Sequence, residues 1–431
     1  MVKPIQIKNF FEFVKNSKVI DVLSILEKEG FEAYLAGGAV RDMLLNKSPY
    51  DFDIATNAKP KDVKRLFPKH TTRGERFGTI AVIFNDSEIF EITTYRSEDV
   101  YTDSRHPDQI KFSDNLFEDS KRRDFTINAL YANNSGQIQD PQNGIQDLDH
   151  QLIRTVGFAE ERFSEDALRV LRAFRFSSQL GFKLDADTQS AALQNWSNLS
   201  KVSIERVFVE LKKMIKGQDF TNVLPMILEQ GLLEYFVESN SKFDLEDLSF
   251  LSQRLKDYQA SEYIFENFLL DLAVTKKNNF EHHLKDWIYL LPLKKTEKNF
   301  FEEALHFFKV LNSFKKDAPK VKNYTSNDSN PVVGRIIRIG LNVWKLSELK
   351  IYISDLILKK IDSDPLLSSK LLKTLNNLKE EPVAKIKAKD LIFKGIKPGP
   401  SLRHSIERGL EFQIENPSLS EAEILDFVIN N

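Results

Sequence analysis

Strand-forming patterns are confined to the first third of this 431-residue sequence. Short apolar runs bounded by turn residues occur at residues 31–36, 79–84 and 89–95. Residues 5–29 carry apolar residues at helical spacing, and from residue 212 onward the strand pattern gives way to long helix-compatible segments. A chain of this length is expected to divide into several domains. We therefore predict an α+β fold, with a small mixed head followed by mostly helical parts.

The first expected strand ends in the pair Gly37-Gly38, and the helical segment that follows contains Arg41. A Gly-Gly turn between a strand and a helix lets backbone N–H groups approach phosphate oxygens closely, although many such pairs are only tight turns. Asp51 and Asp53 come next, and strand alternation would place both carboxylates on one side. Carboxylate pairs of this kind can hold Mg²⁺ together with substrate phosphates, although an isolated Asp-x-Asp is often a surface feature.

Two further groups near this pair are candidates for the same site. Glu91 lies in the second strand of the expected hairpin, where it is either a third metal ligand or a solvent-facing side chain, and both interpretations stay open. Arg123 ends a cationic run before an apolar stretch and is a candidate phosphate clamp. Residues 96–112 form a long polar segment beside the expected sheet, which favours a functional loop.

A row of charged residues recurs every three positions from Asp166 through Arg169 and Arg172 to Arg175. We expect one helix with Ser164 as its N-cap and this row along one face. An acceptor at Asp166 one turn before the donors of Arg169 mirrors the pairing edge of cytosine or adenine, whereas uracil and guanine present the opposite pattern. Such acid–arginine pairs are also common as solvated surface pairs. Arg172 and Arg175 would reach phosphates or hold the carboxylates in place.

Charge and composition exclude several classes of protein. The formal net charge is −2, so any nucleic-acid surface must be local, and the basic residues around 397–400 are the candidate. The sequence has no cysteine, which excludes disulfides and thiol nucleophiles. No uncharged apolar run approaches the length of a membrane span, and we expect a cytoplasmic protein. A helix at 203–211 is expected to brace the charged row through Arg206 and Glu210, and residues 315–330 read as a linker or loop.

Four motifs occur in a fixed order: Gly37–Asp42, Asp51–Asp53, Arg122–Leu130 and Glu165–Arg169. Together they resemble the class II tRNA nucleotidyltransferase and poly(A) polymerase family. The layout, including the loop at 397–400, is similar to that of bacterial CCA-adding enzymes of the Bacillus type. The resemblance implies a polymerase-beta-like catalytic head at 1–148 and a helical neck for base recognition at 149–212. It further implies a helical body at 213–320 and a tRNA-binding helical tail at 321–431.

The resemblance also implies an activity: template-independent addition of C, C and A to the 3′ end of tRNA from CTP and ATP, with release of pyrophosphate by a two-metal mechanism. The expected cofactor is Mg²⁺, and a homodimer is possible. The implied roles are metal binding and catalysis by Asp51 and Asp53, triphosphate binding by Gly38, Arg41 and Arg123, base reading by Asp166 and Arg169, and completion of the nucleotide site by Arg172 and Arg175.

Several alternatives stay open at this point. An A-adding enzyme and a poly(A) polymerase share these motifs, whereas the presence of residues 96–112 disfavours a CC-adding enzyme because the family needs that loop for the last A. An antibiotic-modifying nucleotidyltransferase would share the Gly-Gly and Asp-x-Asp chemistry without needing the base-reading pair. A non-catalytic RNA-binding protein would be expected to lack a metal ligand, and both Asp51 and Asp53 are present.

Overall fold

The computed structural model describes residues 5–85, 88–98, 110–231, 245–257, 261, 264–275, 291–316, 332–341, 349 and 365–430. Backbone contacts divide the chain into two compact units, Met1–Val223 and Leu224–Asn431. Most of the expected loop at 96–112 and of the expected linker at 315–330 lies outside the described residues.

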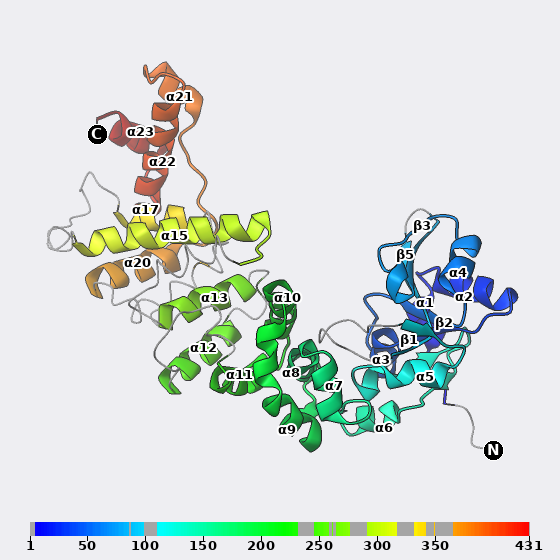
Figure 1. Cartoon of the computed structure of the whole chain (residues 1–431). Coiled ribbons are helices and arrows are strands. Elements are labelled where there is room, and N and C mark those ends of the chain that lie inside the picture. Colours follow the sequence, from blue (N-terminus) through cyan, green and yellow to red (C-terminus); the bar gives the residue numbers. More distant parts are fainter. Residues whose placement is uncertain are drawn as a thin grey trace. The chain divides into compact units, whose positions relative to one another are not determined.

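A seven-stranded mixed sheet forms the centre of the first unit, in the order β3-β4-β5-β2-β1-β8-β9 (Figure 1). The strands are β1 Ala33–Ala36, β2 Asp53–Thr56, β3 His70–Thr71, β4 Thr79–Phe84, β5 Glu88–Thr94, β8 Tyr131–Ala132 and β9 Ile138–Gln139. The expected hairpin is confirmed, since β4 and β5 pair antiparallel along their whole length. β2 pairs antiparallel with β1 and parallel with β5. Alternation along β5 buries Phe90 and Ile92 and leaves Glu91 exposed.

Short helices surround this sheet: α1 Phe10–Val14, α2 Val19–Lys28, α3 Gly38–Leu44, α4 Pro60–Leu66, α5 Leu116–Lys121, α6 Gly144–Asp149 and the 3₁₀ turns Glu75–Phe77 and Thr126–Asn128. The helical pattern predicted for 5–29 is therefore broken into two helices. The break falls where the Ser17 hydroxyl accepts a hydrogen bond from the Val19 N–H at 3.2 Å, because serine side chains compete with helical backbone bonding. A separate ladder pairs β6 Arg96–Glu98 with β7 Ile110–Phe112.

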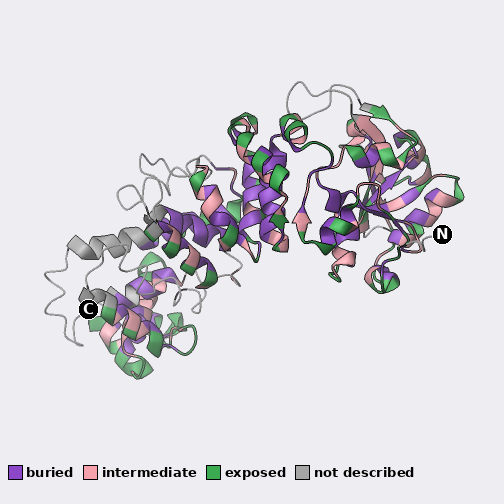
Figure 2. Ribbon diagram, turned by 90° about the horizontal axis from the view of Figure 1, so that it is seen from below, coloured by how far each residue is buried: buried purple, intermediate pink, exposed green. Residues whose placement is uncertain are grey.

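The rest of the first unit is mainly helical, with α7 Ala159–Glu165, α8 Leu168–Leu180, α9 Ala186–Gln194, the 3₁₀ stretch Trp196–Lys201 and α10 Ile204–Ile215. Two short strands, β10 Leu152–Ile153 and β11 Lys183–Leu184, pair parallel and add a small sheet that the sequence did not indicate. Buried residues line the facing sides of these helices and fill the sheet (Figure 2). α8 ends at Gly181, whose φ of 73° suits glycine.

The prediction that one helix starts at Ser164 is wrong. Ser164 lies inside α7, where its hydroxyl donates to the Glu160 carbonyl at 2.8 Å. Asp166 then adopts an extended backbone, with φ −142° and ψ 102°, and its carboxylate accepts the N–H of Leu168 at 3.0 Å. The aspartate therefore separates two helices because its carboxylate caps the start of the second.

The second unit consists of helices where it is described. They are α12 Leu245–Asp257, α13 Ile264–Thr275, α15 Lys295–Lys316, α17 Val332–Gly340, α20 Pro365–Asn377, α21 Ala388–Phe393, α22 Pro400–Glu415 and α23 Glu421–Asn430; α11 Phe220–Glu229 spans the boundary between the units. Arg338 of α17 binds Glu411 of α22 at 2.8 Å. Gly409 of α22 lies so close to Ile386 that an added Cβ would come within 2.4 Å of its Cδ1. Within the described part of the chain, no helix is long and apolar enough to cross a membrane.

Candidate active site

The turn between β1 and α3 brings backbone and an arginine together. Gly37 has φ 70° and ψ −125°, and its N–H donates to the Leu130 carbonyl at 2.9 Å. A Cβ at Gly37 would lie 3.1 Å from Nη1 of Arg123, so glycine leaves room for that guanidinium. Gly38 begins α3. The Gly-Gly turn and the predicted phosphate clamp are therefore neighbours.

Three carboxylates gather beside this turn. Asp53 is the first residue of β2, and the parallel register sets it opposite Glu91 of β5. Asp51 lies two residues earlier, and all three residues are exposed. The pKa of Asp53 is raised to about 6, mainly through desolvation by the surrounding protein. The negative charges of Asp51 and Glu91 contribute to this rise, and the positive charge of Arg123 opposes it.

The oxygen donors of Asp51 and Asp53 fit a hard divalent cation, because such a cation would offset the charge repulsion that adds to the effect of desolvation on the pKa of Asp53. Among the described residues, no group of three or more His, Asp or Glu side chains is positioned to hold a metal ion. The role of Glu91 as a third ligand therefore stays a prediction.

Arg41 is buried next to the same turn. Its Nη1 donates to Oδ1 of Asn128 at 2.7 Å, and its Nη2 donates to Oδ1 of Asp42 at 2.7 Å. The guanidinium also lies over the ring of Phe176 at 5.2 Å from the centroid. Because Phe176 belongs to α8, this contact connects the turn to the helix with the charged row.

The base-reading pair lies at the start of α8, and each member has protein partners. Oδ2 of Asp166 accepts from Nη2 of Arg206 on α10 at 2.9 Å. Nη1 of Arg169 donates to Oε2 of Glu165 at 2.5 Å, and its Nη2 donates to the Arg122 carbonyl at 3.3 Å. The bond to Arg122 connects the reading helix to the cationic run of the head.

The later arginines of the row hold carboxylates, one of the two roles that the sequence left open. Nε of Arg172 donates to Oδ2 of Asp124 at 2.8 Å. Nε of Arg175 lies 2.7 Å from Oε2 of Glu210 on α10, and its guanidinium lies 4.0 Å from the Phe176 ring centroid. Burial and the nearby Arg172 lower the pKa of Arg175 to about 10. With Arg206 and Glu210 both engaged, the predicted bracing helix at 203–211 is confirmed.

Four residues of this region had no role assigned from the sequence: Asp119, Asp124, Asn128 and Tyr131. Asp124 and Asn128 lie within the motif Arg122–Leu130, which was the available signal, and Asn128 Nδ2 donates to Asp124 Oδ1 at 3.2 Å. Asp119 and Tyr131 carry no local signal, because their importance depends on burial in the folded head, where both side chains are inaccessible.

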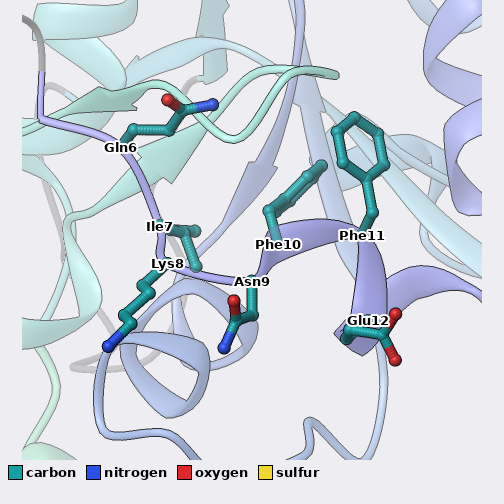
Figure 3. Close-up of a pocket in the computed structure, with 7 residues that line it drawn as sticks. All are labelled: Gln6, Ile7, Lys8, Asn9, Phe10, Phe11 and Glu12. Carbon is teal, nitrogen blue, oxygen red and sulfur yellow. The ribbon is translucent and has the colours of Figure 1, made fainter.

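A surface hollow of about 480 Å³ lies elsewhere in the head, lined by residues 6–12 around the start of α1 (Figure 3). None of the predicted site residues lines it. The candidate site is therefore defined by the charged groups described above rather than by this hollow.

Comparison with known proteins agrees with the motif order. Residues 33–154 match the family model described as the Poly A polymerase head domain. Residues 181–242 match the model described as a probable RNA and SrmB-binding site of polymerase A. The CCA-adding enzyme of Leuconostoc citreum is 43% identical over 268 residues, which is 62% of this chain and 65% of that protein. The CCA-adding enzyme of Lactobacillus delbrueckii subsp. bulgaricus is 35% identical over 415 residues, covering 95% of this chain and 97% of that protein.

The chain belongs to the CCA-adding enzyme family. Membership confirms the predicted enzyme class, a tRNA nucleotidyltransferase. The structure is similar to that of the Bacillus stearothermophilus CCA-adding enzyme in complex with CTP, with a TM-score of 0.61 and 27% identity over 98% of each chain. The α+β fold with a polymerase head followed by helices is thereby confirmed. The Thermotoga maritima CCA-adding enzyme complexed with tRNA, at 19% identity and a TM-score of 0.62, shares the fold.

Proposed function

We propose that this chain adds C, C and A to the 3′ end of tRNA from CTP and ATP without a nucleic-acid template, releasing pyrophosphate. The observation that carries the proposal is the placement of Asp51, Asp53 and Arg123 around the Gly37 turn, within the same compact unit as the base-reading helix. Metal-ligand candidates, a phosphate clamp and a base-reading pair are the three parts that such a reaction needs.

Asp51 and Asp53 are proposed to hold Mg²⁺. When bound there, Mg²⁺ would favour the ionised tRNA 3′-hydroxyl and neutralise charge on the departing pyrophosphate. The Arg123 guanidinium lies beside the Gly37 turn and acts electrostatically on Asp53, and it would bind the triphosphate together with Gly38 and Arg41. These residues act by position and charge, so the proposal needs no separate general base.

Asp166 and Arg169 are proposed to read the incoming base. The Arg206 bond fixes the carboxylate of Asp166, and the Glu165 and Arg122 bonds fix the guanidinium of Arg169. A fixed acceptor and a fixed donor discriminate well between bases, because the wrong base leaves buried polar groups unpaired. Arg172 and Arg175 are proposed to complete the nucleotide site from the next two turns of α8, while holding Asp124 and Glu210.

The remaining assignments follow from the same proposal. We place catalysis at 1–148, base recognition at 149–212 and tRNA binding in the tail at 321–431, with the body at 213–320 between them. In the tail, Lys394, Lys397 and Arg403 are exposed around the turn before α22. We further propose a cytoplasmic location and a homodimer, the latter testable by light scattering.

The direct test is product sequencing. The full-length protein is incubated with CTP and ATP, separately and together, on tRNA lacking its 3′ CCA and, in parallel, on tRNA that ends in CC. The proposal expects two C additions with CTP alone and CCA with both nucleotides. Addition of A alone to a tRNA that already ends in CC would identify an A-adding enzyme, products ending at CC would identify a CC-adding enzyme, and long A tails would identify a poly(A) polymerase.

A further inference from the structure

Asp119 is a buried acid that the proposed reaction does not use directly. Its side chain is fully inaccessible to solvent, although it lies in a short helix, α5, of the head. Ionised carboxylates are expensive to bury, so a buried one needs several compensating partners. Asp119 has them, and they converge on the predicted phosphate clamp.

One oxygen of Asp119 faces Arg122 and the other faces the clamp. Oδ1 accepts from Nε of Arg122 at 2.8 Å, with Nη2 of the same residue at 2.7 Å. Oδ2 accepts from the Tyr131 hydroxyl at 2.9 Å and from Nη2 of Arg123 at 3.4 Å. Burial alone would raise the pKa of Asp119, but the guanidiniums of Arg122 and Arg123 outweigh it and lower the pKa.

Tyr131 closes the arrangement from β8. Its hydroxyl donates to Asp119 and accepts from Nε of Arg123 at 3.2 Å, while the Arg123 guanidinium lies 5.0 Å from the centre of its ring. Burial raises the pKa of Tyr131, so the hydroxyl keeps the proton that it donates. Arg123 is thus held through both Nε and Nη2, and its Nη1 lies at the Gly37 turn.

Asp53 is a second carboxylate that acts on Arg123. Asp53 attracts the same guanidinium electrostatically, and Arg123 in turn opposes the rise in the pKa of Asp53. An unrestrained arginine side chain has several rotatable bonds and would be drawn toward the carboxylates proposed to bind the metal. The contacts with Tyr131 and Asp119 hold Nε and Nη2 of the guanidinium and so restrict this movement.

We propose that Asp119 and Tyr131 are positioning residues that fix the Arg123 guanidinium for the triphosphate of the incoming nucleotide. This inference rests on the proposed function, because it takes Arg123 to be a phosphate-binding residue. Neither residue needs to touch the nucleotide, since the pair sets the direction and the freedom of Arg123. Preorganised donors bind a charged group better than mobile ones because less side-chain entropy is lost on binding.

The test compares CTP with CMP, which lacks the β and γ phosphates. Dissociation constants for CTP and CMP are measured by calorimetry on the full-length protein with Mg²⁺ and without tRNA. Asp119→Asn should weaken CTP binding by about tenfold to a hundredfold, the range for losing a hydrogen bond to a charged group, with CMP binding unchanged. Tyr131→Phe, a milder change, should weaken CTP binding by about threefold to tenfold, again without affecting CMP. Glu118→Gln is the matched control, because Glu118 pairs with Lys121 on the same helix.

The double variant Asp119→Asn with Arg123→Ala separates the possible failures. Positioning predicts that Asp119→Asn adds almost nothing once Arg123 is absent. If Arg123→Ala alone leaves CTP affinity unchanged, the proposed role of Arg123 is wrong. If Arg123→Ala weakens CTP but neither Asp119→Asn nor Tyr131→Phe does, the positioning inference is wrong and the proposed function stands. An equal loss of CTP and CMP affinity in Asp119→Asn and in Tyr131→Phe would also overturn the positioning inference. If Asp119→Asn does not fold, the result for Tyr131→Phe decides the test.

Discussion

Replacing Asp124 with Asn tests the contact between the cationic run of the head and the reading helix. The side chain of Asp124 is only 11% exposed, and its Oδ2 accepts a hydrogen bond from Nε of Arg172 at 2.8 Å. Burial would raise the pKa of Asp124, but Arg172 and the hydrogen bond from Asn128 lower it from 3.8 to about 2. At 1.36 kcal/mol per unit, this shift corresponds to about 2 kcal/mol of folding free energy.

The lowered pKa of Asp124 determines how its contribution to stability changes with pH. Because the folded-state pKa lies below the unfolded-state value, the stabilisation is complete above about pH 4 and is lost as the pH falls toward 2. Asp124→Asn should therefore lower the free energy of unfolding by about 2 kcal/mol at pH 7, and by about half as much at pH 3.

Urea unfolding of wild type and variant from pH 7 to pH 3 measures this difference. Asp114→Asn serves as the control, since Asp114 is an exposed carboxylate in the same part of the head. A difference between wild type and Asp124→Asn that stays constant across this pH range would refute the reasoning, because it would show that the charge of Asp124 does not stabilise the fold.

Two further predictions concern catalysis and tRNA binding. Replacing Asp51 or Asp53 with Ala should reduce nucleotide addition to background while tRNA affinity and the urea midpoint stay nearly unchanged; wild-type turnover with Mg²⁺ in either variant would contradict the metal assignment. Neutralising Lys394, Lys397 and Arg403 together should weaken tRNA binding and reduce the slope of log affinity against log salt by about 2 to 3, with CTP affinity unchanged. An unchanged slope would count against the tail surface.

Local patterns were sufficient where the physics is local. Turn residues between two β-branched runs predicted the hairpin of β4 and β5, because that pattern depends only on neighbouring residues. The predicted order of strand, Gly-Gly turn and helix is confirmed by β1, Gly37 and α3, and Gly37 adopts the positive φ that glycine allows. The motif order predicted the family because it samples residues from several elements at once.

What the sequence could not predict depends on distant partners. Arg41 bonds to Asn128, 87 residues away, and Asp53 meets Glu91 only because β2 and β5 pair in parallel with one register. The predicted helix start at Ser164 failed for a local reason, since Asp166 two residues later competes as a cap. Asp119 could not be predicted as a site residue, because a carboxylate on a short polar helix is expected at the surface and only the folded structure shows that it is buried.

The central claim is that protein side chains, rather than a nucleic-acid template, select the incoming base. Its most direct test is the ratio of specificity constants for CTP over UTP in wild type and in Asp166→Ala. Asp166→Asn is measured for comparison, because it retains an acceptor for the Leu168 N–H. Uracil would set acceptor against acceptor at Asp166 and donor against donor at Arg169, and each mismatch costs about 1 to 3 kcal/mol. Because Asp166→Ala removes only the mismatch at Asp166, the account predicts that it lowers the ratio by about fivefold to a hundredfold. A ratio that stays at the wild-type value while overall activity falls would show that Asp166 only caps α8, and would contradict the claim.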